Sequence, residues 1–310
     1  MGAQGQKIVV LMATYNGAKH IEEQLQSLAS QTHANWELIV SDDGSTDRTI
    51  QIVHQFSQAI SQRVTVIKGP QQGFWRNFLW LAKQVDQAEG ALFAFCDQDD
   101  IWLPDKLERA AKWLSNVGQR EPGLYFSRTE LVDESGKQIG LSPLFRRSPT
   151  FQNALVQNIG GGNTMVANRP AMALLAETPK SIKLIAHDWW TYQLVTGAGG
   201  RAFYDPVPSL KYRQHRRNLI GSNRGVRARV KRTFAFASGR WKHWNDVNFR
   251  ALCTVKDLLS PSARSTFDDF SLARRSRLIR RLYLLSRSGV YRQNASETAA
   301  MYLGAIFGRI

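Results

Sequence analysis

Two acidic stretches decide the fold: Ser41-Asp42-Asp43-Gly44-Ser45-Thr46-Asp47 and Cys96-Asp97-Gln98-Asp99-Asp100. Each follows a short apolar run, which is Trp36-Glu37-Leu38-Ile39-Val40 in the first case and Ala91-Leu92-Phe93-Ala94-Phe95 in the second. Such runs predict buried strands, and carboxylates at their ends lie at the carboxyl edge of a parallel sheet, where open α/β proteins bind ligands. We therefore expect both acidic stretches to reach one crevice that suits a nucleotide and a divalent cation.

Short apolar runs alternate with helical periodicity from Lys7 to about Leu114. The pattern predicts strands at residues 8–12, 36–40, 64–67 and 91–95, and helices at about 18–30, 47–58 and 74–85. Such alternation indicates an α/β fold with a mainly parallel central sheet and helices on both faces.

The regular alternation of strands and helices ends after Leu103-Pro104. The proline favours the start of a helix that runs to about Leu114. Strand-like pieces follow at residues 124–126, 163–167, 201–204 and 209–212, with helices near 151–157, 170–176 and 187–195. This second half therefore predicts a mixed sheet that carries an acceptor site.

Positive charge is concentrated in the C-terminal third. The net charge is +16, and residues 211–310 carry 22 Lys and Arg against 5 Asp and Glu, so the preceding residues are near neutral. Residues 276–285 place arginines and apolar side chains on opposed helical faces, as helices in a membrane interface do. The apolar residues 301–308 are far fewer than the roughly 20 of a spanning helix. We expect residues 222–310 to form a basic, mainly helical, membrane-associating region.

Cysteine usage and the first residues indicate a compartment. Cys96 falls inside a predicted strand and far from Cys253, so we expect a core thiol, no disulfide and reducing surroundings. Residues 1–6 lack the basic segment and apolar stretch of a secretory signal. A cytoplasmic protein is the expectation.

Five motifs, taken together and in order, resemble the family 2 glycosyltransferases of the GT-A fold. They are Met12-Ala13-Thr14-Tyr15-Asn16-Gly17, Ser41–Asp47, Gly73-Phe74-Trp75-Arg76-Asn77, Asp97-Gln98-Asp99-Asp100-Ile101-Trp102 and His187-Asp188-Trp189-Trp190. The likeness covers roughly residues 7–221, so residues 1–221 would form the catalytic domain. Its nucleotide-sugar half would span about 7–115 and its acceptor half about 116–221.

The resemblance implies a set of nucleotide-sugar contacts. Thr14, Tyr15 and Asn16 match the wall around the base and the ribose. Asp42 matches the carboxylate that accepts the N3 hydrogen of a uracil or thymine ring. Arg76 is placed to meet the diphosphate, because a guanidinium pairs well with phosphate oxygens.

A divalent cation, Mg²⁺ or Mn²⁺, is implied by the same resemblance. Asp97 and Asp99 match the acid-x-acid motif that holds the ion beside the donor phosphates, with Asp99 the stronger ligand candidate. Asp97 is also expected to contact the nucleotide-sugar. His215 would be a late metal or phosphate ligand, and Arg213 a second phosphate contact.

Asp188 resembles the catalytic base of the family. It would take a proton from an acceptor hydroxyl as that oxygen attacks the anomeric carbon. Trp189 and Trp190 would line the acceptor pocket. A single in-line displacement inverts the anomeric configuration, so the resemblance implies a metal-dependent, inverting glycosyltransferase.

The Asp-Gln-Asp-Asp-Ile-Trp and His-Asp-Trp-Trp forms further resemble bacterial rhamnosyltransferases that build cell-surface polysaccharides. This likeness implies a dTDP- or UDP-linked donor, with L-rhamnose as the first expectation, and a lipid-linked or saccharide acceptor. With the basic C-terminal region, it implies peripheral attachment to an anionic membrane surface, the cytoplasmic face of the inner membrane, and no nucleic acid as a partner.

Plainer interpretations remain for single residues. Asp42 and Asp43 fit an Asx-type turn that precedes a helix, with Asp47 as the N-cap of that helix. Asp188 fits an acid favoured by a helix dipole. Arg76 fits a surface arginine, and His215 fits a structural role equally well.

Other functions are weighed against the same residues. A dinucleotide-dependent oxidoreductase would carry Gly-x-Gly-x-x-Gly after the first strand, where this chain has Ala13-Thr14-Tyr15-Asn16-Gly17. The alternative function is a nucleic-acid-binding protein that uses the basic, aromatic-rich C-terminal region. That alternative leaves the acidic crevice unexplained.

Overall fold

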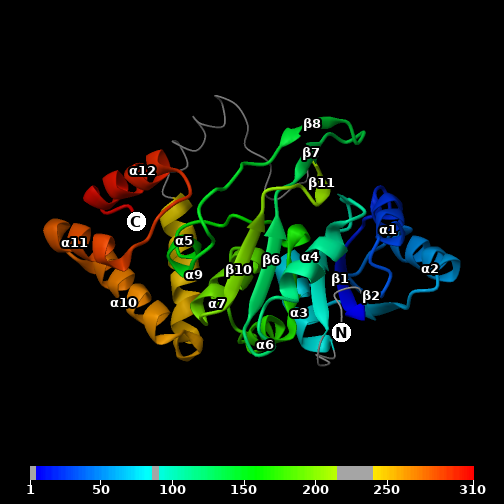
Figure 1. The fold of residues 1–310 in the computed structure, drawn as a ribbon, viewed down its shortest axis with the longest axis horizontal. Helices are drawn as coiled ribbons and strands as arrows, with labels where there is room; N and C mark the ends of the chain where they lie inside the picture. Colours follow the sequence, from blue (N-terminus) through cyan, green and yellow to red (C-terminus); the bar gives the residue numbers. More distant parts are fainter. Residues whose placement is uncertain (1–4, 86–90, 215–239) are drawn as a thin grey trace.

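A computed structural model describes residues 5–85, 91–214 and 240–310. A seven-stranded sheet forms its centre, in the order β10-β6-β9-β4-β1-β2-β3 (Figure 1). The strands are β1 (Ile8–Thr14), β2 (Trp36–Asp42), β3 (Val64–Lys68), β4 (Leu92–Cys96), β6 (Gly123–Ser127), β9 (Val166–Asn168) and β10 (Arg201–Asp205). β9 runs antiparallel to β4 and β6, and the other neighbours are parallel. The predicted α/β fold with a mainly parallel sheet is confirmed.

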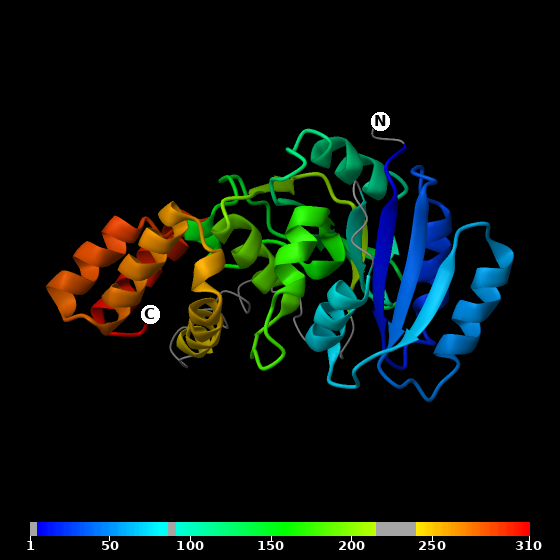
Figure 2. The same ribbon diagram turned by 90° about the horizontal axis from the view of Figure 1, so that it is seen from below.

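Helices cover both faces of this sheet, as predicted (Figure 2). They are α1 (Ile21–Ala29), α2 (Thr49–Ala59), α3 (Phe74–Gln84), α4 (Lys106–Leu114), α5 (Phe151–Ala154), α6 (Arg169–Ala176) and α7 (His187–Gly197). Apolar residues of α1, α2 and α4 share one core cluster, and those of α3, α5, α6 and α7 share the other. Strand β1 supplies both clusters because successive side chains point to opposite faces: Val10 joins the first and Leu11 the second.

A second sheet, in the order β5-β11-β7-β8, was not predicted from the sequence. Its strands are short: β5 (Ile101–Trp102), β7 (Glu130–Val132), β8 (Gln138–Leu141) and β11 (Leu210–Arg213). β5 begins directly after Asp100 and pairs antiparallel with β11. The small sheet therefore joins the second acidic stretch to residues 210–213.

The predicted strand at residues 163–167 is only partly correct. The chain forms a 3₁₀ turn at Gly162–Thr164 before β9 begins at Val166. The hydroxyl of Thr164 donates to the carbonyl oxygen of Gly161 at 2.7 Å, and this local bond closes the turn. Cys96 is a buried free thiol, as predicted.

Helices make up most of residues 240–310. They are α9 (Arg240–Thr254), a 3₁₀ turn (Lys256–Leu258), α10 (Pro261–Arg275), α11 (Leu278–Ser288) and α12 (Ala295–Ile306). Leu252, Phe267 and Leu285 join the same core cluster as α7, so these helices continue the core of the preceding region. The predicted boundary at 221/222 lies outside the described residues, and the division into two regions stays a prediction. Within the described ranges, every helix falls short of the length and apolarity needed to span a bilayer.

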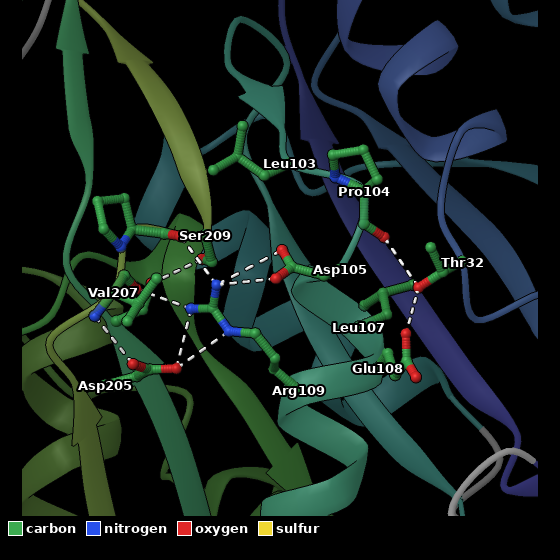
Figure 3. A network of polar contacts seen from close by, with 12 residues as sticks. Thr32, Leu103, Pro104, Asp105, Leu107, Glu108, Arg109, Asp205, Val207 and Ser209 are labelled. Carbon is green, nitrogen blue, oxygen red and sulfur yellow. Dashed lines mark hydrogen bonds and ion pairs between the residues drawn. The ribbon is translucent and has the colours of Figure 1, made fainter.

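Arg109 of α4 holds the chain between β10 and β11 in place (Figure 3). Its guanidinium lies 2.9 Å from the carboxylate of Asp205 and donates to the carbonyl oxygens of Val207 at 2.7 Å and Pro208 at 3.0 Å. The hydroxyl of Tyr125 donates to the same Asp205 oxygen at 2.6 Å. One mostly buried side chain thus binds a carboxylate and two backbone carbonyl oxygens of this connection.

Replacing Arg109 by Ala should lower the free energy of unfolding by about 2–4 kcal/mol, because the Asp205 carboxylate is left without its cation. Urea unfolding measures the change. The control is Asp105→Ala, which removes the other, half-exposed ion-pair partner of Arg109 and should cost less than about 0.5 kcal/mol. Equal losses in the two variants would contradict the assigned role of Arg109.

Candidate active site

The two acidic stretches lie at the same edge of the central sheet. Thr14 of β1 is in register with Asp42 of β2, and Met12 of β1 is in register with Cys96 of β4. Because β2 and β4 flank β1, their ends are about 10 Å apart, which is two strand spacings. The structure thus brings the regions of Asp42 and Asp97 to one edge, a separation that a nucleoside diphosphate spans.

The carboxylate of Asp42 organises the loop in which it stands. It accepts hydrogen bonds from the Thr14 hydroxyl at 3.0 Å, from the backbone N–H of Gly44 at 3.2 Å and from the backbone N–H and hydroxyl of Ser45. Thr14 is buried, so its side chain serves this loop. The contact of Asp42 with a nucleotide base stays a prediction. The N3 hydrogen of a uracil or thymine ring would have to share the Asp42 carboxylate with these donors.

Tyr15 and Asn16 form the loop after β1, and their side chains differ in accessibility. The amide oxygen of Asn16 accepts from the backbone N–H of Thr46 at 2.8 Å, and its backbone has a φ of 47°. The ring of Tyr15 is 58% exposed. Tyr15 therefore offers an open aromatic face, whereas Asn16 joins the two loops.

Gln98, the middle residue of the acid-x-acid motif, fastens that motif to the loop after β1. Its side-chain amide accepts from the backbone N–H of Tyr15 at 2.9 Å and donates to the Tyr15 carbonyl at 3.1 Å. Gly17 permits this approach, since a Cβ there would lie 2.3 Å from the Gln98 amide oxygen. Sequence reasoning missed Gln98, because a glutamine between two aspartates gives no sign of a distant partner.

Asp43 positions the start of α3. Its carboxylate accepts from the backbone N–H groups of Gln71 at 2.7 Å and Gly73 at 2.9 Å. Arg76 stands in the first turn of α3, donates to the side chain of Gln72 and lies 4.9 Å from the Trp75 ring centroid. Its predicted contact with the diphosphate stays a prediction.

Asp47 stabilises the turn before α2, but its plainer interpretation as the N-cap is wrong, because Arg48 is the N-cap of that helix. Its carboxylate accepts from the backbone N–H of Thr49 at 3.0 Å and from that of Ala18 at 3.1 Å. Burial acts in the opposite direction, but the bond from the Thr49 hydroxyl and these backbone bonds together lower the pKa of the Asp47 carboxyl.

Carboxylates gather where β4 ends. Burial, followed by the charges of Asp99 and Asp188, raises the pKa of Asp97 to about 7. Burial, Asp99 and Asp97 raise the pKa of Asp100 well above its ordinary value. The charges of Asp99 and Asp188 therefore both act on Asp97, although Asp97 and Asp188 are 91 residues apart in the sequence.

Lys106 lies beneath this cluster and was missed by sequence reasoning. Its ammonium is fully buried, donates to the carbonyl oxygen of Asn163 and lies 4.0 Å from the Trp102 ring centroid. Burial lowers its pKa to about 7, while Cys96, Asp100 and Asp97 oppose that shift. The side-chain amide of Asn163 also donates to Asp100, so cation and acids form one network.

Asp188 lies in the first turn of α7 and is fixed by backbone donors. It accepts from the N–H of Trp189 at 2.6 Å and from that of Gly162 at 3.2 Å. Burial raises its pKa to about 6, against these bonds and one from the side chain of Asn158. The carboxyl is therefore ionised at neutral pH and held in one orientation.

His187 precedes this carboxylate and is packed among rings. It stacks on Phe78 with centroids 4.1 Å apart and meets Phe95 edge to face at 5.4 Å. Burial lowers its pKa to about 3, so the ring stays neutral. A Cβ at Gly162 would lie 2.3 Å from the His187 ring, which explains the glycine at that position.

The two predicted acceptor walls are both buried. Trp190 is fully buried in the core and donates its indole N–H to the Thr178 hydroxyl at 2.9 Å. Trp189 donates to the carbonyl oxygen of Ala154 at 2.7 Å and meets Trp244 of α9 edge to face. In this structure Trp190 has no surface to offer an acceptor, and a contact by Trp189 stays a prediction.

Arg213 does not take the phosphate-binding position expected of it. Its side chain is 2% exposed and binds the carbonyl oxygens of Asp99 at 3.2 Å and Glu134 at 2.8 Å, together with the carboxylate of Glu23. The guanidinium instead ties β11 to the acidic stretch and to α1. His215, the predicted late ligand, lies outside the described residues.

The donor set at the end of β4 fits a cation shared with a substrate. Within residues 5–85, 91–214 and 240–310, histidine, cysteine, aspartate and glutamate form no group of three or more arranged to hold a metal. Asp97 and Asp99 nevertheless repel each other at close range. Oxygen donors of this number suit Mg²⁺ or Mn²⁺ that takes its other ligands from phosphates and water.

Replacing Asp97 by Asn should stabilise the metal-free protein more at high pH than at low pH. The native pKa of Asp97 is raised above its unfolded value, so the native state binds the proton more tightly, and its stability falls as the pH rises towards 7. The gain in unfolding free energy should be at least about 1 kcal/mol larger near pH 8 than near pH 5. Urea unfolding in EDTA measures it, with the half-exposed Asp105→Asn as control. A gain that is equal at both pH values would contradict the raised pKa.

Known proteins of one family resemble this chain. The description "Glycosyl transferase family 2" matches residues 9–120. The dTDP-rhamnosyl transferase RfbG of Shigella flexneri is 30% identical over 237 residues, which cover 71% of this chain and 77% of that protein.

Two solved structures share the fold. Staphylococcus aureus TarS 1–349, in complex with UDP-GlcNAc, has a TM-score of 0.56 at 19% identity and covers 98% of this chain and 88% of its own. The mannosyltransferase PcManGT from Pyrobaculum calidifontis, in complex with GDP-Man and Mn²⁺, has a TM-score of 0.52 at 18% identity, with coverages of 98% and 86%. None of these likenesses favours the nucleic-acid-binding alternative. The chain has the GT-A fold and belongs to glycosyltransferase family 2.

Proposed function

We propose that this glycosyltransferase moves a sugar from a nucleoside-diphosphate donor to an acceptor hydroxyl with inversion of the anomeric carbon. The observation that carries the proposal is the proximity of Asp188 to Asp97, whose charges interact although they stand on α7 and at the end of β4. One carboxylate is suited to the incoming hydroxyl and the other to the departing diphosphate. A single displacement requires these two functions on opposite sides of the anomeric carbon.

Asp188 would act as the general base. Its carboxyl has a pKa raised to about 6 by burial, so it is ionised at neutral pH yet more basic than an exposed aspartate. The hydrogen bonds from Gly162 and Trp189 orient it. The acceptor hydroxyl would pass its proton to Asp188 while its oxygen bonds to the anomeric carbon and the bond to the phosphate oxygen breaks.

Asp97 and Asp99 would hold Mg²⁺ or Mn²⁺ beside the donor diphosphate, and His215 would complete the set. The bound ion would neutralise the charge that develops on the leaving diphosphate. Arg76 would contribute a second positive charge from α3. Asp42 and the exposed ring of Tyr15 would receive the base, with Thr14 and Asn16 holding the loop.

The first candidate donor is dTDP-L-rhamnose, and a UDP-linked sugar is the second. The similarity to the dTDP-rhamnosyl transferase RfbG supports the first, and the UDP-GlcNAc complex of TarS supports a pyrimidine diphosphate. The acceptor would be a lipid-linked or saccharide intermediate of a cell-surface glycan. The enzyme would work as a peripheral protein on the cytoplasmic face of the inner membrane, attached through its basic C-terminal region.

Asp188→Asn should reduce sugar transfer by at least about a hundredfold, because the amide cannot accept the hydroxyl proton. The two backbone bonds end on different carboxylate oxygens, so the amide oxygen still accepts one of them, and the unfolding of the variant is measured beside its rate. Release of nucleoside diphosphate in the presence of acceptor measures the rate. The control is Asp257→Asn, an exposed aspartate of the C-terminal helices. Full turnover by Asp188→Asn would overturn the base assignment.

A thermal-shift panel tests the donor. A ligand that binds only the native state raises the melting temperature, so dTDP-rhamnose or a UDP-sugar should do so, and more strongly with Mn²⁺ than with EDTA. Asp99→Ala should abolish the Mn²⁺-dependent part of the shift. A shift that is identical in Mn²⁺ and EDTA would contradict the metal proposal and leave the base proposal standing.

A further inference from the structure

Apolar side chains are exposed mainly on the C-terminal helices. Seven of the twelve large apolar side chains exposed in the described ranges fall within residues 272–307. Six of them belong to α11, α12 and the residue that follows α12; they are Leu278, Ile279, Tyr283, Leu303, Ile306 and Phe307. We call these six residues the α11–α12 face. A cluster of this kind on a folded protein marks an interaction surface.

The two helices that carry these side chains contact each other. Arg281 of α11 donates to the carbonyl oxygen of Ala305 in α12 at 2.7 Å. Ile279 is two residues from that bond on α11, and Phe307 is two residues from it beyond the last turn of α12. Ile279 is 86% exposed and Phe307 is 75% exposed. The six side chains thus come from two helices that are hydrogen-bonded to each other and lie at one end of the molecule (Figure 1).

The other apolar side chains of α11 are buried in the core. Leu284 and Leu285 are buried in the large apolar cluster, and α11 packs against α10. Ile279 and Tyr283 are four residues apart, so they share a different stripe of the helix. The exposed apolar residues are thus a second face of α11 in addition to the one that the core uses. The apolar positions within residues 276–285 therefore include members of both the buried face and the exposed face.

Arginines surround this face. Residues 271–310 contain eight arginines and a single acidic residue, Glu297, which pairs with Arg292. Within the part of the chain that the structure describes, the exposed arginines 275, 277, 280 and 309 have no carboxylate within ion-pair distance. Arg277 and Arg280 line a shallow hollow together with Leu278, Ile279 and Tyr283. Apolar tips with a cationic rim complement a surface that is anionic outside and apolar beneath.

We propose that the α11–α12 face docks into an anionic lipid bilayer, with its six apolar side chains entering the interface and the neighbouring arginines pairing with lipid phosphates. This inference rests on the membrane location proposed above and assigns it to particular residues. α11 and α12 lie at the end of the molecule opposite α1 and α2 (Figure 1, Figure 2). Docking there leaves the first half of the sheet clear of the bilayer.

Substitutions on the face test it better than truncation does. Removing the C-terminal helices would also take Leu252 and Phe267 out of the core and expose the apolar surface of α7. The test variant is the double substitution Ile279→Asp, Phe307→Asp in the full chain. Its matched control is Ile139→Asp, because Ile139 is a 51% exposed isoleucine on β8.

Sedimentation with phosphatidylglycerol-containing vesicles measures docking, and pure phosphatidylcholine vesicles give the uncharged comparison. The wild type and Ile139→Asp should bind phosphatidylglycerol vesicles alike, and the double variant should bind at least about tenfold more weakly. Arg277→Gln, Arg280→Gln should weaken binding and reduce its dependence on salt. Undiminished binding by the double variant would overturn the proposal.

A fluorescent reporter tests insertion directly. An environment-sensitive dye on Ile279→Cys, in a Cys253→Ser background, should shift to shorter wavelength on addition of phosphatidylglycerol vesicles; Cys96 is buried and stays unlabelled. The same dye on Ile139→Cys should not shift. A shift at Ile139, or none at Ile279, would contradict insertion of this face.

The remaining outcomes separate this inference from the function on which it rests. Nucleotide-dependent stabilisation, measured without vesicles, should be equal in the wild type and the double variant. A wild type that ignores vesicles but binds nucleotide would overturn the docking proposal and leave the transferase intact. A wild-type dimer that the double variant loses, without lipid binding, would assign the face to a second copy of the chain and overturn it too.

Discussion

Mutual repulsion of carboxylates at the end of β4 is the constraint on which the site depends. Asp97 and Asp100 are pushed towards their neutral forms by burial and by the charge of Asp99. A cluster of this kind lowers the stability of the metal-free fold, and the buried ammonium of Lys106 offsets only part of the cost. The surroundings hold the acids in place all the same, through Asn163, the Arg213 backbone N–H and the bonds of Gln98 to the loop after β1. A cation that binds with the donor would relieve the repulsion between these carboxylates. The preformed carboxylate cluster would therefore contribute to the affinity for the donor.

Local patterns predicted the sheet edge well, because strand period and the ends of apolar runs are local properties. Asp42 and Asp97 stand in acidic stretches that follow apolar runs, and Asp188 was singled out by the resemblance of its motif to a family motif. Lys106 could not be found in this way, since nothing near it in sequence distinguishes it from a surface lysine. The role of Arg213 depends on Asp99, 114 residues away. Contacts between residues so far apart in sequence form only when the folded sheets and helices pack together. The short strands of the second sheet depend on the same packing, so neither can be predicted from a single sequence.

The C-terminal helices have two kinds of surface. Leu285 and Phe267 join the apolar core that also contains α7, so these helices support the helix that presents Asp188. The outer stripe of α11, by contrast, exposes Ile279 beside arginines that have no carboxylate partner among the described residues. The basic, aromatic composition of this region therefore reflects both packing and an outward face. Because the C-terminal helices and α7 share one core, attachment of the α11–α12 face to a membrane would hold Asp188 at a fixed distance from that membrane.

Titration of Mn²⁺ followed by electron paramagnetic resonance tests the central claim most directly. With a pyrimidine nucleoside diphosphate present, a carboxylate site completed by phosphate oxygens should remove the signal of free Mn²⁺ up to a single ion per chain, and the protein without nucleotide should take up far less. A signal of free Mn²⁺ that is undiminished when protein and nucleotide are added together would contradict the account.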